Sequence, residues 1–470
     1  MAGSSAAELK FTVRRQPAVL VSPAGPTPRE LKRLSDIDDQ DGLRFHVPVI
    51  FFFRRQDGPQ HDPAAVLRDA IAAALVHYYP LSGRLRELEG RKLAVDCTGE
   101  GVLFVEADAD VRLEQFGADL QPPFPCLDEL MFDVPGSSAL LDTPLFLFQV
   151  TRLACGGFVF GVRMQHTIAD GAGLVQFLCA VEEMAGGAAA PTVRPVWGRE
   201  LLEAPRDSDR LPRSFAHREY DEVPDTNGTI VPVDSMAHRS FFFGPQEMAA
   251  IRSHLPPSLR RSATTFEALA GCLWRCRTVA LAPGDEEEMR MICIVNLRGK
   301  SSIVPRGYYG NAFAFPAAVS TAGNLCRKPV GYAVGLVRKA KREVDMEYLQ
   351  SVARLMVRRQ RPGITVVRAY LVSDVSKTGI RDFDFGWGKP VYGGPAKGGV
   401  GTIPGIASFF IAFRNAKGED GIVVPVCLPH AAMDKFVEEM GKLLMPADNI
   451  VMATTEQLAG NMFSMIKAAL

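Results

Sequence analysis

His166 is the histidine whose position best suits chemistry in this chain. It follows the apolar run from Phe158 to Met164 and precedes Thr167-Ile168-Ala169-Asp170-Gly171, so we expect it where a buried strand meets the start of a helix. A strand end is rigid, and an imidazole held there can face a cleft as a general base, because its pKa lies near neutral pH. The alternative is a histidine that is hydrogen-bonded in the core.

Asp170 has two possible roles in the same segment. It stands directly before the predicted helix, where an aspartate side chain commonly accepts hydrogen bonds from the first free backbone N–H groups. It could instead orient the site around His166.

A second unusual segment is Asp384-Phe385-Gly386-Trp387-Gly388, in which two glycines flank one of only three tryptophans. The glycines predict a tight turn with an indole at its tip. Taken alone, this pattern favours a packed loop over a site.

Several other kinds of catalytic and cofactor site lack their sequence patterns. There is no GxSxG, no GxxxxGK[ST] and no GxGxxG after a strand. The nine cysteines form no CxxC pair and no zinc-ligand pattern, so we expect free thiols, no metal and no cofactor.

Composition excludes some function classes and predicts a location. The chain has 470 residues, with 53 Lys plus Arg balanced by 53 Asp plus Glu, which argues against a nucleic-acid binder or a protein of anionic membrane surfaces. We find no apolar run long enough to span a membrane and no signal-peptide pattern at the start. Free thiols suit a reducing compartment, so we predict a cytoplasmic protein.

The apolar patterning predicts two α/β domains, at residues 1–185 and 235–470. Between them, residues 186–234 are rich in Pro, Gly, Arg and Asp and lack a sustained period, which favours a long crossover linker. The expected strands are Phe45–Phe53, buried on both faces, Leu145–Leu153, Phe158–Met164, Met289–Leu297, Ser408–Phe413 and Gly421–Leu428. The expected helices are Pro63–Tyr78, Gly171–Ala185, Thr265–Thr278 and Pro429–Leu444.

The two motifs together resemble a known family. HTIAD at His166 to Asp170, followed more than two hundred residues later by DFGWG at Asp384 to Gly388, is similar to the plant BAHD acyl-CoA-dependent acyltransferases. The resemblance covers about Phe11 to Met465, and further matching segments are Leu34 to Asp38, Tyr78 to Arg84, Thr265 to Glu267, Trp274 to Arg277 and Tyr308 to Asn311. Val295 to Asn311 and Gly421 to Pro429 look like the branch that includes benzyl-alcohol benzoyltransferases and monolignol acyltransferases.

The resemblance implies two chloramphenicol-acetyltransferase-like domains with a channel between them. His166 would lie in the middle of the channel and take the proton of the acceptor hydroxyl as it attacks the acyl-CoA thioester. Asp170 would pair with Arg298 in a structural role. Trp387 would donate to the oxyanion, or the Asp384–Gly388 loop would instead support the channel from a distance.

The resemblance also implies where the two substrates bind. For CoA, the helix start with Ser262, Thr264 and Thr265 offers groups suited to phosphate, and Lys300 and Ser301 are further candidates. The acceptor would meet Val47, Val49 and Phe51, which alternate along one strand, and Lys377, which stands where shikimate-using members carry an arginine.

The apolar run predicts a less polar acceptor than shikimate, and the family resemblance then implies a p-coumaroyl-CoA:monolignol transferase, acting as a monomer on two small molecules. The alternative is a benzoyl- or acetyl-CoA transferase that acts on benzyl or short aliphatic alcohols. Two other classes stay open: a condensation-type enzyme that uses a carrier-bound acyl group, and a silent binding protein. Gln165 stands where the first would carry a second histidine, and intact His166, Asp170 and Trp387 argue against the second.

Overall fold

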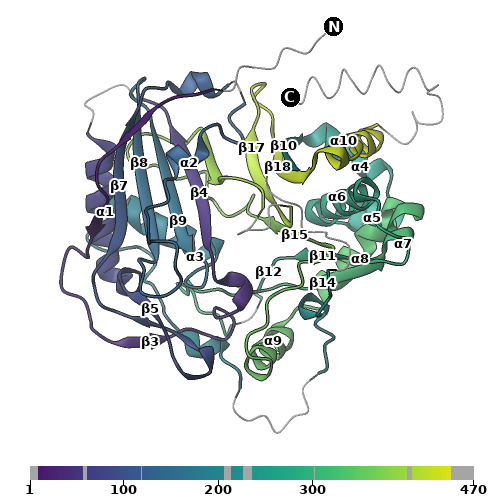
Figure 1. Cartoon of the computed structure of the whole chain (residues 1–470), viewed down its shortest axis with the longest axis horizontal. Coiled ribbons are helices and arrows are strands. Elements are labelled where there is room, and N and C mark those ends of the chain that lie inside the picture. The colour runs from purple at the N-terminus through teal and green to yellow at the C-terminus, as the bar shows by residue number, and fades with distance from the viewer. Residues whose placement is uncertain are drawn as a thin grey trace.

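The computed structural model describes residues 9–56, 61–117, 119–205, 213–225, 235–300, 302–399 and 405–445. They form two α/β units side by side, each built on a mixed sheet (Figure 1). This is the architecture that the sequence predicted.

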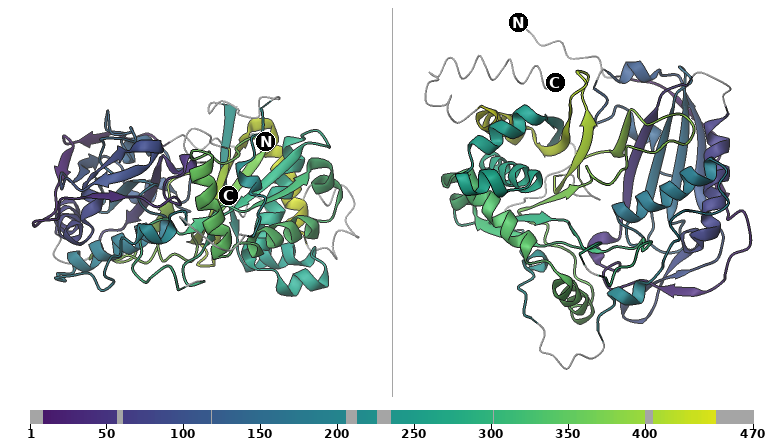
Figure 2. Two further views of the ribbon diagram at one scale, coloured as in Figure 1. Left: turned by 90° about the horizontal axis from the view of Figure 1, so that it is seen from below. Right: turned by 180° about the vertical axis from the view of Figure 1, so that it is seen from behind.

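The first unit is a sheet covered on one face by two long helices (Figure 2, right). The helices are α1 (Pro63–His77) and α3 (Gly171–Ala185), and α2 (Leu127–Leu130) is a single turn. The strand order is β1 (Val13–Arg15), β7 (Val102–Ala109), β8 (Phe146–Leu153), β9 (Phe158–Gln165), β4 (His46–Phe53) and β16 (Tyr392–Pro395), with β2 (Val19–Val21) also paired to β7. A separate small sheet joins β3 (Leu31–Arg33), β6 (Leu93–Asp96) and β5 (Arg84–Glu87).

The second unit has its own six-stranded sheet and contains the α-helices of the second half of the chain. Its strand order is β10 (Met236–Phe243), β18 (Asp420–Pro429), β17 (Ala407–Arg414), β15 (Ala369–Asp374), β11 (Glu288–Cys293) and β14 (Ala317–Thr321). β12 (Val295–Asn296) pairs with β13 (Phe313–Ala314) beside it. The helices are α4 (Pro245–Ser253), α5 (Pro257–Ser262), α6 (Thr265–Leu281), α7 (Ala322–Arg327), α8 (Val330–Arg342), α9 (Met346–Arg358) and α10 (His430–Leu444).

Strand β4 is buried on both faces, as predicted. Phe51 and Phe53 join the core that contains α1 and α3, whereas Ile50 and Phe52 join a second core on the opposite face. Aromatic and β-branched side chains fit such a strand because they pack well on a pleated surface.

The second half of the chain returns to the first unit. β16 pairs antiparallel with β4, with Tyr392 opposite Phe52 and Pro395 opposite Val49. Trp387, just before this strand, is part of the core under α1 and α3. The predicted division at residues 235–470 therefore does not follow the fold, because a segment assigned to the second domain completes the first sheet.

The crossover links the two units without long regular elements. In its described ranges, 186–205 and 213–225, the helical segments are two short 3-10 turns, Arg199–Leu202 and Arg218–Tyr220. The Glu219 carbonyl accepts a hydrogen bond from the Thr365 N–H of the second unit.

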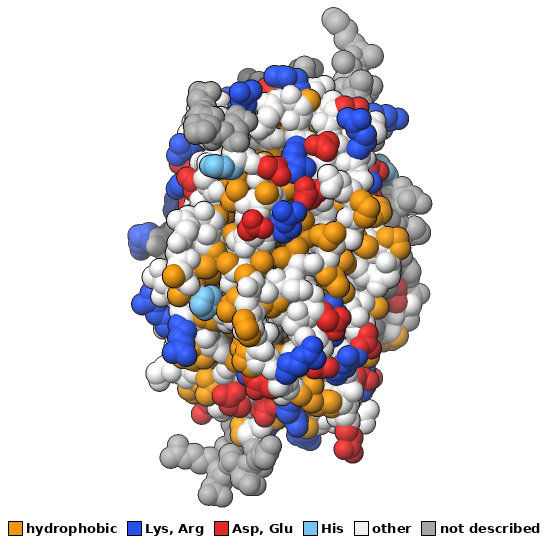
Figure 3. All heavy atoms as spheres, turned by 90° about the vertical axis from the view of Figure 1, so that its left-hand side faces the viewer, with side chains coloured by type: hydrophobic (Ala, Val, Ile, Leu, Met, Phe, Trp, Pro, Cys, Tyr) orange, Lys and Arg blue, Asp and Glu red, His pale blue; other side chains and the backbone are white. Residues whose placement is uncertain are grey.

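The outer face of the first unit mixes apolar side chains with charges of both signs (Figure 3). Among the helices that the structure describes, none is both long enough and apolar enough to cross a bilayer.

Candidate active site

A cavity of about 1150 Å³ lies between the two units, and His166 stands in its wall. The first unit contributes residues 41–48, which include the start of β4, and part of segment 127–133. It also contributes Arg163, His166, Asp170, Gly171 and Ala172. The second unit supplies an apolar wall, made by Ile294, Phe313, Phe315, Leu371, Ile406 and Phe409. The cavity is therefore a site shared between the units, as the resemblance implied.

His166 is placed by the end of strand β9. Its backbone N–H donates to the carbonyl of Phe45, which precedes the neighbouring strand β4 (2.9 Å). Its imidazole lies between two rings, with centroid distances of 5.5 Å to Phe45 and 6.0 Å to Phe313. Burial lowers the pKa of His166, although its own backbone carbonyl and the carboxylate of Asp170 act in the opposite direction. The imidazole is therefore neutral near pH 7, the form that a general base requires.

Asp170 caps helix α3 and pairs with Arg298, as predicted. Its Oδ1 accepts a hydrogen bond from the Gly173 N–H (2.9 Å). Its Oδ2 accepts from Arg298 Nη1 (2.6 Å) and from the Ala312 N–H (3.1 Å). Both oxygens are engaged by groups of the fold, which gives Asp170 a structural role beside His166.

The Asp384–Gly388 loop is a self-contained turn. Asp384 Oδ1 accepts from the N–H groups of Gly386 (2.9 Å) and Gly388 (2.8 Å). Both glycines have positive φ, 103° and 71°, a region that favours glycine. Phe385 and Trp387 point into the core of the first unit.

Trp387 lies far from His166. Its ring packs edge-on against Phe158, with centroids 5.2 Å apart, and Phe158 begins the strand that His166 follows. At about 3.3 Å per residue, the eight residue steps from Phe158 to His166 span roughly 26 Å. The prediction that Trp387 donates a hydrogen bond to the oxyanion is therefore wrong. The alternative, that the Asp384–Gly388 loop supports the channel from a distance, fits the structure.

The predicted CoA residues lie outside the cavity lining, around the start of helix α6. Thr264 caps this helix by accepting from the Glu267 N–H (3.2 Å), so its hydroxyl is already engaged. Ser262 accepts from Arg338 Nη1 (2.6 Å), and Thr265 is exposed. Burial, and then the positive charge of Lys341, lower the pKa of Lys300. Ser301 lies outside the described residues.

The predicted acceptor residues divide between cavity and core. Val47 lines the cavity together with its neighbours His46 and Pro48. Val49 and Phe51 are instead buried in the core against the helices, 3% and 0% exposed. Lys377 is exposed and is not one of the described residues that line the cavity.

Sequence reasoning missed most of the cavity wall. Phe45, Phe313, Phe315 and Leu371 are far apart in the chain, and only the folding of the second unit against the first brings them to His166. Their shared signal is apolar character within or beside a strand, which core residues also show.

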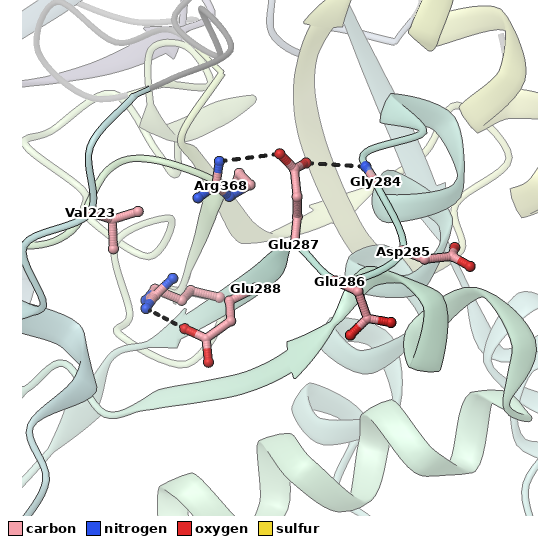
Figure 4. Close-up of a pocket in the computed structure, with 8 residues that line it drawn as sticks. Val223, Gly284, Asp285, Glu286, Glu287, Glu288 and Arg368 are labelled. Carbon is pink, nitrogen blue, oxygen red and sulfur yellow. Dashed lines mark hydrogen bonds and ion pairs between the residues drawn. The ribbon is translucent and has the colours of Figure 1, made fainter.

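A second cavity, of about 590 Å³, lies in the second unit at the loop before β11 (Figure 4). Four of its charged groups form two ion pairs: Arg368 with Glu287 (3.6 Å) and Arg290 with Glu288 (3.0 Å). Across the residues that the structure describes, no cluster of His, Cys, Asp and Glu could hold a metal ion.

Comparisons with known proteins agree with this geometry. The family model described as Transferase family matches residues 10–443. The chain is 60% identical over 446 residues to a benzyl alcohol O-benzoyltransferase of Petunia hybrida, covering 94% of this chain and 96% of the relative. It is 59% identical over 454 residues to a benzyl alcohol O-benzoyltransferase of Nicotiana tabacum (96% and 98%) and 51% identical over 446 residues to a (Z)-3-hexen-1-ol acetyltransferase of Arabidopsis thaliana (94% and 97%).

Solved structures share the fold at lower sequence identity. The crystal structure of vinorine synthase superposes with a TM-score of 0.67 at 22% identity, covering 92% of this chain and 98% of that one. TRI101 of F. sporotrichioides, complexed with coenzyme A and T-2, gives a TM-score of 0.61 at 16% identity (87% and 96%). These structures show the shared fold. The family model and the close benzyl alcohol O-benzoyltransferase relatives show that the chain belongs to the Transferase family of BAHD acyltransferases and is an acyl-CoA-dependent O-acyltransferase.

Proposed function

We propose that this enzyme transfers a benzoyl group from benzoyl-CoA to benzyl alcohol or a similar small alcohol. The observation that carries the proposal is the aromatic and aliphatic wall beside His166, together with the 60% identity to a benzyl alcohol O-benzoyltransferase. The relatives described above are benzyl alcohol O-benzoyltransferases and a (Z)-3-hexen-1-ol acetyltransferase. They favour a benzoyl or acetyl transferase over the predicted monolignol transferase.

The apolar wall suits an aromatic substrate. Phe313 and Phe315 pack edge-to-face against each other (4.9 Å between centroids), and Phe313 also borders the His166 ring. A benzyl or benzoyl ring against such a pair gains apolar burial and an aromatic contact of about 0.5–1.5 kcal/mol. Shikimate has no aromatic ring to make this contact, and each of its hydroxyl groups left unpaired against the wall would cost about 1–3 kcal/mol.

In the proposed reaction, His166 is the general base. Its neutral imidazole takes the hydroxyl proton while the alcohol oxygen forms a bond to the thioester carbonyl carbon. The carbon–sulfur bond then breaks, and the imidazolium returns the proton to the CoA thiolate. The oxyanion needs a donor, and the cavity lining offers the side chains of Asn296 and Ser373 for that role.

We place the CoA phosphates outside the cavity, at the start of α6. Lys300, Arg338 and Lys341 bring three cationic side chains to this region, next to the exposed Ser262 and Thr265. A thioester is already an activated acyl donor, so we propose that no metal or redox cofactor takes part; turnover should survive EDTA unchanged.

A competition assay of acyl-CoAs against alcohols tests the proposal. We expect the highest kcat/KM for benzoyl-CoA with benzyl alcohol, and thiol release that depends on both substrates. A best pair of p-coumaroyl-CoA with coniferyl alcohol would contradict it and restore the monolignol prediction. Replacing Phe313 with Leu should reduce the preference for benzyl alcohol over (Z)-3-hexen-1-ol by roughly 2–10-fold, because it removes the aromatic contact.

A further inference from the structure

The segment from Leu34 to Gln40 buries three aspartates that take no part in the mechanism above. Asp36, Asp38 and Asp39 are 4%, 0% and 0% exposed. A buried carboxylate is costly unless cations and hydrogen-bond donors surround it. Their cationic partners come from separate parts of the fold, which marks this segment as a junction between the units.

Asp38 accepts hydrogen bonds from three segments of the chain. Its Oδ2 accepts from the hydroxyl (2.6 Å) and the N–H (3.1 Å) of Ser35. Its Oδ1 accepts from the N–H (2.8 Å) and the side-chain Nδ2 (2.9 Å) of Asn311 in the second unit. Arg199 Nη1, from the crossover, also reaches Oδ1 (3.3 Å).

The two distant partners of Asp38 hold the backbone that carries the base. Asn311 Nδ2 also donates to the carbonyl of His166 (2.9 Å). Arg199 Nη2 donates to the carbonyl of Ile168 (2.7 Å). The Asp38 carboxylate therefore holds Asn311 and Arg199 in place. These two side chains donate to the backbone carbonyls on either side of Thr167.

Packing around these donors leaves little room for them to move. A Cβ atom on Gly310 would lie 1.0 Å from Arg199 Nη1, and one on Gly173 would lie 2.0 Å from the Tyr309 carbonyl oxygen. On the other side, Asp170 accepts from the Ala312 N–H. The segment 308–312 is thus held between Asp38 and Asp170, directly behind His166.

We propose that Asp38 is a positioning residue for catalysis, which acts on His166 through Asn311 and Arg199. The inference rests on His166 being the base of the proposed function. Because the imidazole is carried by this backbone, loss of the carboxylate displaces the ring from the reacting hydroxyl, and a displacement of about 1 Å can reduce turnover by about 100-fold.

Asp36 provides a matched control in the same buried segment. It pairs with Lys92 (2.7 Å) and Arg361 (3.1 Å) and accepts from the Ala204 N–H (2.8 Å). Within the described ranges, none of these partners has a hydrogen bond to residues 166–168. Asp36 therefore shares the burial and the ion pairing of Asp38 but not its connection to His166.

The experiment compares Asp38→Asn, Asn311→Ala and Asp36→Asn in the full chain. Asp38→Asn keeps the shape but turns an NH₂ group toward donors, and Asn311→Ala removes the tie to the His166 carbonyl while keeping the backbone N–H. For each variant we would measure the melting temperature, and kcat and KM for both substrates per mole of folded enzyme. The substrates are any acyl-CoA and alcohol that the wild type uses, so the outcome does not depend on the benzoyl assignment.

We expect kcat to fall by roughly 10–100-fold in Asp38→Asn and Asn311→Ala, with both KM values changed less than about 3-fold. Asp36→Asn should lower the melting temperature but keep kcat within about 2-fold. Equal losses of kcat in the Asp36 and Asp38 variants, or a folded Asn311→Ala enzyme with normal kcat, would overturn the proposal. If His166→Ala itself turned over normally, the proposed base would fail, and this result is separate from the other two.

Discussion

The two motif loops, His166–Gly171 and Asp384–Gly388, each contain an aspartate and a glycine but lie in different surroundings. Asp170 accepts a hydrogen bond from the Gly173 N–H in the first turn of α3, and Asp384 accepts from the N–H groups of Gly386 and Gly388 in its own turn. The carboxylate of Asp170 also binds Arg298 of the second unit beside the cavity, whereas Asp384 caps a turn whose indole enters the core of the first unit. The difference teaches that a motif marks a local structure, and only its contacts across the units mark a reaction site.

Replacing His166 with Ala should give the largest effect. It removes the general base, so we expect kcat to fall at least ~100-fold while the melting temperature stays close to that of the wild type. Turnover is measured as thiol release from acyl-CoA. A folded variant with near-normal kcat would mean that the base lies elsewhere.

Removing Asp170 should affect both stability and rate. The Asp170→Ala variant loses the cap of α3 and leaves Arg298 without its partner, so we expect unfolding free energy to fall by about 2 kcal/mol and kcat by roughly 10-fold. Asp384→Ala is the matched change in the other loop. It should reduce stability by about 1 kcal/mol and leave kcat unchanged.

Trp387→Ala tests the second loop more strongly. Trp387 is only 7% exposed, and loss of its indole should cost about 3 kcal/mol of unfolding free energy, as seen for other buried aromatic residues. Per mole of folded enzyme, kcat should stay within about 2-fold of the wild type. Denaturant unfolding and thiol release, measured on the same samples, separate the loss of stability from the loss of turnover. A stable but inactive variant would support a role for Trp387 as hydrogen-bond donor to the oxyanion.

The pH dependence should show a smaller but defined shift. Burial lowers the pKa of His166, and only the neutral imidazole acts as a base. The profile of kcat/KM should therefore be flat near pH 7 and fall at acid pH with a midpoint below about 6.5, the ordinary histidine value. A midpoint above pH 7 would contradict the burial argument.

Local features of the fold were predictable from the sequence. The apolar run before His166 and the aspartate before Gly171 predicted a strand and a capped helix, and both are present as β9 and α3. These elements depend on neighbours a few residues apart, which a sequence pattern records directly.

Long-range features were not predictable in the same way. Val49 and Phe51 alternate with Ile50 and Phe52, but both faces of β4 are buried, so alternation could not tell the cavity face from the core face. The distance of Trp387 from His166 depends on the return of β16 to the first sheet. The tie between Asp38 and Asn311 joins residues 273 positions apart, and no local pattern predicts it.

A crystal structure with CoA and the alcohol bound would test the central claim most directly. We predict that the CoA sulfur and the alcohol hydroxyl meet in the cavity of about 1150 Å³, with the hydroxyl within about 2.6–3.2 Å of the His166 imidazole. The Asp384–Gly388 loop should keep its turn and contact neither substrate. Reacting atoms found beside Trp387 instead of His166 would contradict the account.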